Sequence, residues 1–140
     1  MNLKESIRKR RSVRKYQDKP VPDNIVKEII ELARRAPSAG GLRGYKVFVT
    51  NQKMTNQIDA PLYLVVCADP EKYAKGYGDR GRNLYSVQDA TIFGAYIQLL
   101  AVDYGLATVW VGAFVEGRVR RALKTELRPI VILCLGYELQ

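Results

Sequence analysis

The chain carries three arginines and a serine within the five residues Arg10-Arg11-Ser12-Val13-Arg14. A phosphate monoester presents nearly two negative charges and several acceptor oxygens, which guanidinium forks and a hydroxyl donor bind well. If the segment is extended, Arg10, Ser12 and Arg14 share one face, because side chains alternate along an extended chain. On composition alone, a solvated basic turn is the favoured interpretation of the same residues.

Two later segments are rich in small residues, past which a ligand could reach the backbone. The first is Ala36-Pro37-Ser38-Ala39-Gly40-Gly41, where Ser38 also offers a hydroxyl. It lacks the G-x-G-x-x-G spacing of a nucleotide-binding loop, and taken alone it fits a helix-ending loop better. The second runs from Gly105 to Phe114, where the end of a strand could present backbone N–H groups to a ligand. A core strand with a packing Trp110 is the alternative there.

The residue types that are missing or sparse limit which kinds of catalytic or metal site the chain could form. The chain has no histidine, which excludes histidine-based triads and histidine general bases. Cys67 and Cys134 lie in separate apolar runs without zinc-ligand spacing, so we expect buried, reduced thiols and no metal site. If the chain is an enzyme, we therefore expect something other than acid–base side chains to carry the reaction.

The charge balance favours anionic partners. Lysine and arginine total 23 against 14 acidic residues, which gives a net charge of +9. The basic residues are scattered along the chain and no nucleic-acid-binding motif accompanies them, so nucleic-acid binding is only a minor alternative.

No apolar run approaches the roughly 20 residues that span a bilayer, and the basic N-terminus lacks a secretory hydrophobic region. We expect no membrane partner and a cytoplasmic location.

Hydrophobic periodicity predicts one α+β domain over residues 1–140. Four helices are expected, at residues 2–9, 23–36, 84–104 and about 117–125, with Asn2 capping the first and Asp23 the second. Four strands are expected, at residues 45–50, 62–68, 107–114 and 130–136. Residues 51–60 are predicted to form a polar connection, and residues 69–83 an exposed loop or lid. The helix at 84–104 is apolar around almost its whole circumference, so we expect part of it to pack on a second copy of the chain.

Five features in order along the chain resemble the nitroreductase family of flavoproteins. They are Arg10–Arg14, Ala36–Gly41, Asp89 within the apolar helix, Gly105-Leu106 leading to Trp110–Gly112, and Leu135-Gly136-Tyr137. The resemblance covers nearly the whole chain. It implies an antiparallel sheet of about four strands sandwiched between helices, in an intertwined homodimer with FMN at the interface.

The resemblance also implies which residues bind FMN. Arg10, Arg11, Ser12 and Arg14 match the segment that holds the phosphate, the ribityl chain and the pyrimidine edge. The loop with Pro37, Ser38, Ala39 and Gly41 matches the one that reaches the flavin from the opposite subunit. Val111, Gly112 and Ala113 match the turn that lies beside the flavin N5. No side chain is expected to be catalytic, because the flavin itself carries the hydride.

The implied activity is that of an FMN-dependent oxidoreductase. It passes a hydride by a ping-pong mechanism from NAD(P)H through flavin N5 to an electron-poor acceptor such as a nitroaromatic or a quinone. The alternatives are an FMN carrier or sensor without turnover and, less favoured, a basic nucleic-acid-binding domain.

Three departures from the family pattern bear on these expectations. The asparagine of the family's Asn-x-Gln-Pro-Trp run is absent from Gly41–Tyr45, where Arg43 is a candidate substitute. The connection at 50–60 is short. Many relatives continue past the position of Gln140 with a phosphate-binding basic residue, and Arg118, Arg120, Arg121 and Lys124 are candidates to compensate for it.

Overall fold

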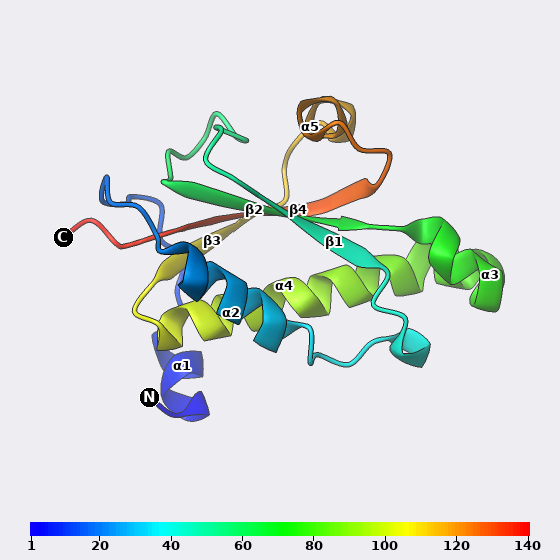
Figure 1. Ribbon diagram of the computed structural model, residues 1–140, viewed down its shortest axis with the longest axis horizontal. Coiled ribbons are helices and arrows are strands. Elements are labelled where there is room, and N and C mark those ends of the chain that lie inside the picture. Colours follow the sequence, from blue (N-terminus) through cyan, green and yellow to red (C-terminus); the bar gives the residue numbers. More distant parts are fainter.

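Four antiparallel strands form the centre of the fold. The computed structural model describes residues 1–140, and the strands lie in the order β1-β2-β4-β3 (Figure 1). Their bounds are Tyr45–Thr50 for β1, Leu62–Ala68 for β2, Ala107–Val111 for β3 and Arg128–Gly136 for β4. The two central strands are almost wholly buried, as expected of apolar runs that are covered on both faces. The predicted strand 62–68 is confirmed, as is 45–50.

Helices cover both faces of this sheet. Helices α2 (Asp23–Ala33) and α4 (Ser86–Asp103) pack on one face, and α5 (Glu116–Leu123) packs on the other (Figure 1). Because side chains alternate along a strand, β2 and β4 supply residues to two separate cores. Phe93 and Ile97 of α4 lie in the first core and Val119 of α5 lies in the second. The sandwich of an antiparallel sheet between helices is therefore confirmed.

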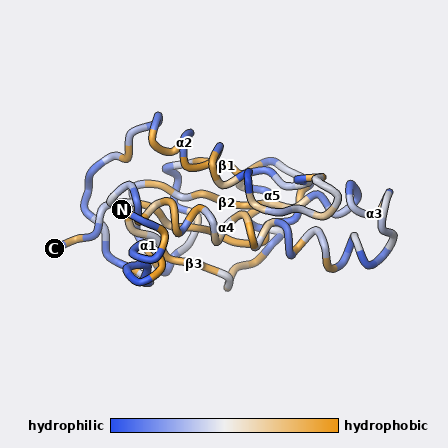
Figure 2. Tube along the Cα trace, turned by 90° about the horizontal axis from the view of Figure 1, so that it is seen from below, coloured by the Kyte–Doolittle hydropathy of each residue, from blue (hydrophilic) through white to orange (hydrophobic).

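Residues 69–83, predicted to be an exposed loop or lid, are helical instead. Helix α3 spans Pro70–Arg80, and a π-helical turn at Gly81–Tyr85 joins it to α4. Asp69 caps α3 and Pro70 begins it, which is the favoured place for proline. The glycines that suggested a loop mark a break within the helical segment at Gly78, where φ is 62°. The fold thus has five α-helices rather than four. Figure 2 shows that α3 is mainly hydrophilic and that α4 and β3 are hydrophobic.

The ends of the first two helices follow simple capping rules. Helix α1 (Leu3–Lys9) begins after Asn2, whose side chain accepts the backbone N–H of Glu5 at 3.0 Å, as predicted. The expectation that Asp23 caps α2 is wrong. Pro22 occupies that position, and Asp23 is the first helical residue, where its negative charge interacts favourably with the helix dipole.

No helix of the structure has the length and apolar character needed to cross a membrane.

Candidate functional site

Residues 10–14, the basic segment, lie along the edge strand β3. Ser12 forms a parallel bridge with Thr108, and the backbone N–H of Val13 donates to the Thr108 carbonyl at 3.0 Å. Val13 is buried, while Ser12 and Arg14 on either side of it are exposed. Farther along the chain, the backbone N–H of Leu139 donates to the carbonyl of Lys15 at 3.0 Å. The segment is therefore extended from Ser12 onward and held by backbone hydrogen bonds at Val13 and Lys15, with Ser12 and Arg14 facing away from the core.

Two of the three arginines in this segment have no acidic partner. The Arg11 guanidinium pairs with the carboxylate of Glu138, which ties the segment to the end of the chain. No carboxylate lies within 4.0 Å of the guanidinium groups of Arg10 and Arg14, and both residues are exposed. Two unpaired guanidinium groups on a fixed backbone suit a phosphate-bearing ligand.

The end of the same strand offers backbone donors. Gly112 and Ala113 follow β3 directly and are exposed, and their N–H groups donate no hydrogen bond within the chain. The strand itself is held against α4, because a Cβ at Gly94 would lie only 2.9 Å from the Trp110 ring. The side chain of Gln98, also on α4, donates to the hydroxyl of Thr108 at 3.2 Å. A rigid strand end with free N–H groups can bind the edge of a ring with acceptor atoms.

The serine loop, residues 37–44, is built around a buried carboxylate. Asp89 of α4, 5% exposed, accepts the hydroxyl of Ser38 at 2.6 Å and the backbone N–H of Ala39 at 3.1 Å. It also accepts the hydroxyl of Tyr73 from α3 at 2.6 Å. Burial, together with this bond to Asp89, raises the pKa of Tyr73 above its ordinary value, so the phenol stays protonated and remains a donor.

Sequence reasoning missed the roles of Asp89 and Tyr73 in this loop. Asp89 entered only as one element of the family pattern, and Tyr73 was placed in a loop. One signal was available, because Asp89 sits in an otherwise apolar helix and a carboxylate buried there must find donors. The identity of those donors could not be found in the same way, since Ser38 lies 51 residues away along the chain.

Arg43, the candidate substitute for the missing asparagine, is engaged inside the loop. Its Nε donates to the carbonyl of Arg34 at 2.6 Å, and its Nη atoms donate to the carbonyls of Gly41 and Ala36 at 3.3 and 3.4 Å. It therefore braces the end of α2 against the loop.

The basic residues of α5 also lie apart from the basic segment: Arg120, Arg121 and Lys124 line a polar pocket of about 440 Å³ at the end of that helix.

The predicted site residues fall into two groups that do not meet within one chain. Arg10–Arg14 and Val111–Ala113 lie at either end of β3 and along its edge. The serine loop, with its short 3₁₀ turn at Ala39–Gly41, lies beside α3 at the far end of the molecule (Figure 1).

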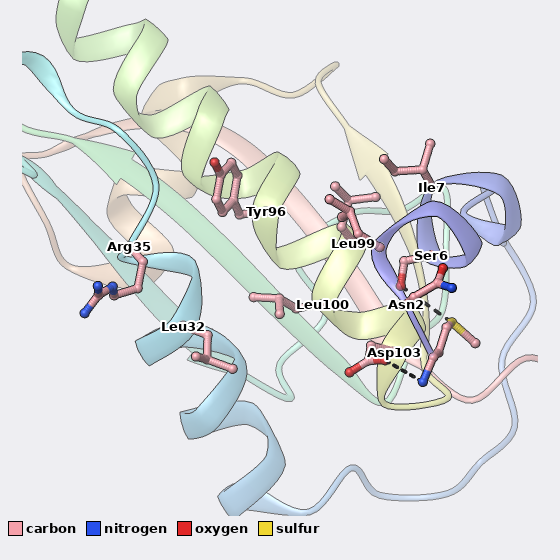
Figure 3. A pocket seen from close by; sticks show the side chains of 11 residues that line it. Asn2, Ser6, Ile7, Leu32, Arg35, Tyr96, Leu99, Leu100 and Asp103 are labelled. Atoms are coloured by element: carbon pink, nitrogen blue, oxygen red, sulfur yellow. Dashed lines mark hydrogen bonds and ion pairs between the residues drawn. The ribbon is translucent and has the colours of Figure 1, made fainter.

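An apolar groove lies on the surface of the molecule, and neither group of site residues lines it. It has a volume of about 540 Å³ and is bordered by α1, α2 and α4 (Figure 3). Leu3, Ile7, Leu32, Tyr96 and Leu99 line it, and the first four are among the exposed large hydrophobic residues of the chain. Large apolar side chains gathered on one exposed surface are typical of an interface.

The chain is similar in sequence to known proteins. The model of the nitroreductase family matches residues 7–59 and 50–137. A protein of Methanothermobacter thermautotrophicus with the provisional name NADH dehydrogenase/NAD(P)H nitroreductase is 33% identical over 156 aligned positions, which cover 98% of this chain and 78% of that protein.

Solved structures extend the comparison to the fold. A nitroreductase family protein of Clostridium difficile 630 has a TM-score of 0.88 at 32% identity, with coverage of 100% of this chain and 86% of that one. An FMN-dependent nitroreductase of Clostridium difficile R20291 has a TM-score of 0.81 at 28% identity, with coverage of 96% and 87%. Because sequence and fold both match over nearly the whole length, the chain belongs to the nitroreductase family.

Proposed function

We propose that the protein is an FMN-dependent NAD(P)H oxidoreductase that acts as a homodimer. The observation that carries the proposal is the placement of two kinds of donor along β3. The unpaired guanidinium groups of Arg10 and Arg14 lie on the segment beside this strand, and the free N–H groups of Gly112 and Ala113 lie at its end. Those donors fit a ligand that has a phosphate at one end and a ring with acceptor atoms at the other, as FMN has. The FMN-dependent nitroreductase of Clostridium difficile supports the same cofactor.

Each residue group has a separate task in this proposal. Arg10 and Ser12 would bind the phosphate. Arg14 would place positive charge near the pyrimidine edge, where reduction leaves negative charge. The N–H groups of Gly112 and Ala113 hold the flavin edge by hydrogen bonds. When bound there, FMN would supply the redox chemistry, which is hydride transfer from NAD(P)H to an electron-poor acceptor such as a nitroaromatic or a quinone. No side chain has to transfer a proton at flavin N5, which is compatible with a chain without histidine.

Two features of the single chain support the proposed dimer. The serine loop lies at the far end of the molecule from the basic segment, so the two groups complete one site only across two copies. The groove beside α4 leaves Tyr96 and Leu99 for a partner to cover. A two-fold dimer that uses this surface would form two equivalent sites.

A spectrum of the purified protein, followed by anaerobic titration, tests the proposal. The protein should bind FMN, absorb near about 450 nm as oxidised flavin does, and bleach with NADH or NADPH. Light scattering should give twice the chain mass. FMN binding without reduction by either nicotinamide would favour a carrier or sensor. A protein that takes up no FMN would refute the cofactor assignment, and salt-sensitive nucleic-acid binding would then favour the basic-domain alternative.

A further inference from the structure

The serine loop is held by side chains more than by its own backbone. Only one 3₁₀ turn provides backbone hydrogen bonds inside it, from Gly41 to Ser38 and from Leu42 to Ala39. Gly40, Gly41 and Arg43 all have left-handed backbone angles, with φ of 56°, 68° and 47°. Glycine adopts such angles without strain but does not fix them, and Arg43 adopts them at a cost in energy, so the contacts around the loop must hold its conformation.

Two polar side chains from outside the loop bind both of its ends. Asp89 accepts hydrogen bonds from Ser38 and Ala39 at the beginning of the loop. The hydroxyl of Tyr73 donates to Asp89 at 2.6 Å and accepts the backbone N–H of Gly44 at 2.9 Å, at the loop's other end. The single phenol oxygen of Tyr73 therefore connects the end of the loop to the carboxylate that binds its beginning.

Helix α3 also packs directly on the loop. A Cβ at Gly44 would lie 2.5 Å from the Tyr73 ring, and a Cβ at Gly40 would lie 2.6 Å from the Tyr77 hydroxyl. Tyr73 and Tyr77 are one helical turn apart on α3, so they share a face. Only Tyr73, which is fully buried, also hydrogen-bonds to the loop. Tyr77 is 41% exposed and its hydroxyl makes no hydrogen bond.

We infer that Tyr73 is a positioning residue for FMN, acting with Asp89 to set the shape of the serine loop. This inference rests on the proposed function, in which the loop of one chain contacts the FMN of its partner. It assigns α3 a role in the site, although α3 lies beside the loop and apart from the basic segment. Tyr73 thus influences the flavin without touching it, and it does so in the other subunit.

The matched pair Tyr73→Phe and Tyr77→Phe tests this role. Tyr73→Phe removes the hydroxyl that donates to Asp89 and accepts the Gly44 N–H, so two buried hydrogen bonds are lost. FMN binding must then also order the loop, and it should weaken about tenfold. It should also change the circular dichroism of the bound flavin, because the loop beside the ring moves. Tyr77→Phe should leave both unchanged. If Tyr73→Phe does not fold, Asp89→Asn, which keeps the side-chain volume, should show the same two effects.

A mixed dimer distinguishes action across the interface from action within one chain. In a dimer of one Arg10→Ala chain and one Tyr73→Phe chain, action across the interface places both defects in one site and leaves the other intact. One FMN should then bind with wild-type affinity. Two weakened sites would refute action on the partner's flavin, and unchanged affinity in Tyr73→Phe would refute the positioning role. Failure of the wild-type protein to bind FMN would instead overturn the proposed function itself.

Discussion

Replacing Arg43 by alanine should destabilise the flavin-free protein by about 2 kcal/mol. The 2.6 Å bond from its Nε to the Arg34 carbonyl is a charged hydrogen bond, worth roughly 1.5–3 kcal/mol. The two bonds from its Nη atoms are 3.3 and 3.4 Å long and should add little. Arg43 is only half-buried, so solvent screening places the total in the lower part of that range.

Replacing Arg43 by glycine distinguishes the effect of the lost side-chain hydrogen bonds from the effect of backbone strain. Arg43 has a φ of 47°, a left-handed conformation that costs an ordinary residue roughly 1–2 kcal/mol and costs glycine almost nothing. Arg43→Gly loses the same hydrogen bonds but recovers about 1 kcal/mol of this cost, so it should be more stable than Arg43→Ala.

Lys124 also has a positive φ, 54°, and its side chain makes no hydrogen bond. Lys124→Gly should therefore stabilise the protein by about 1 kcal/mol.

Urea unfolding of the FMN-free protein at a fixed chain concentration measures these differences. Arg118→Ala is the charge-matched control, because Arg118 is exposed and has no ion pair. FMN titration of each variant then shows whether Arg43 acts on the flavin directly. If Arg43→Ala weakened FMN binding strongly while its unfolding matched that of Arg118→Ala, the guanidinium would be a ligand contact and not a brace for α2.

Three further predictions concern binding and stability. Arg10→Ala should weaken FMN binding by about 1.5–3 kcal/mol, measured by fluorescence titration, because a charge-assisted hydrogen bond to the phosphate is lost. Tyr63→Phe should cost about 1–2 kcal/mol in thermal unfolding, because its buried hydroxyl donates to the Ile58 carbonyl at 2.8 Å; Tyr45→Phe should cost nothing, because the Tyr45 hydroxyl is buried without a partner. Burial raises the pKa of the Cys67 and Cys134 thiols from 9.0 to about 12, so their ionisation favours the unfolded chain as pH rises above about 9. Above that pH, the free energy of unfolding should then fall more steeply with pH in the wild-type protein than in the variant with both Cys67→Ala and Cys134→Ala. The difference in slope should reach up to about 1.4 kcal/mol per pH unit for each thiol.

Local patterns were enough to predict the main elements of the fold. The continuous apolar run at Leu62–Ala68 is a central strand because both of its faces need covering, and Asn2 caps α1 through a bond to a residue three positions away. Helix α3 was missed because its glycines outweighed the signal of Asp69 and Pro70. Glycine counts against a helix in general, but here the conformational break is confined to Gly78.

The candidate site was less predictable because its contacts join distant parts of the chain. The pairing of Ser12 with Thr108 brings together segments 96 residues apart, and no periodic pattern encodes it. Arg43 illustrates the same limit. Its residue type suggested a ligand contact, whereas its environment directs the guanidinium to the carbonyls that the end of α2 leaves without partners.

Helix α4 determines how far apart the two halves of the candidate site lie. Asp89 holds the serine loop, and nine residues later Gln98 holds β3 through Thr108. At 1.5 Å per residue these anchors are about 13–14 Å apart along a rigid helix. Tyr96 and Leu99 of the same helix line the apolar groove, so the surface proposed for dimerisation and the anchors of both half-sites share one rigid body. In a two-fold dimer built on this groove, the distance between each loop and the partner's basic segment is therefore set by helix packing and not by flexible loops.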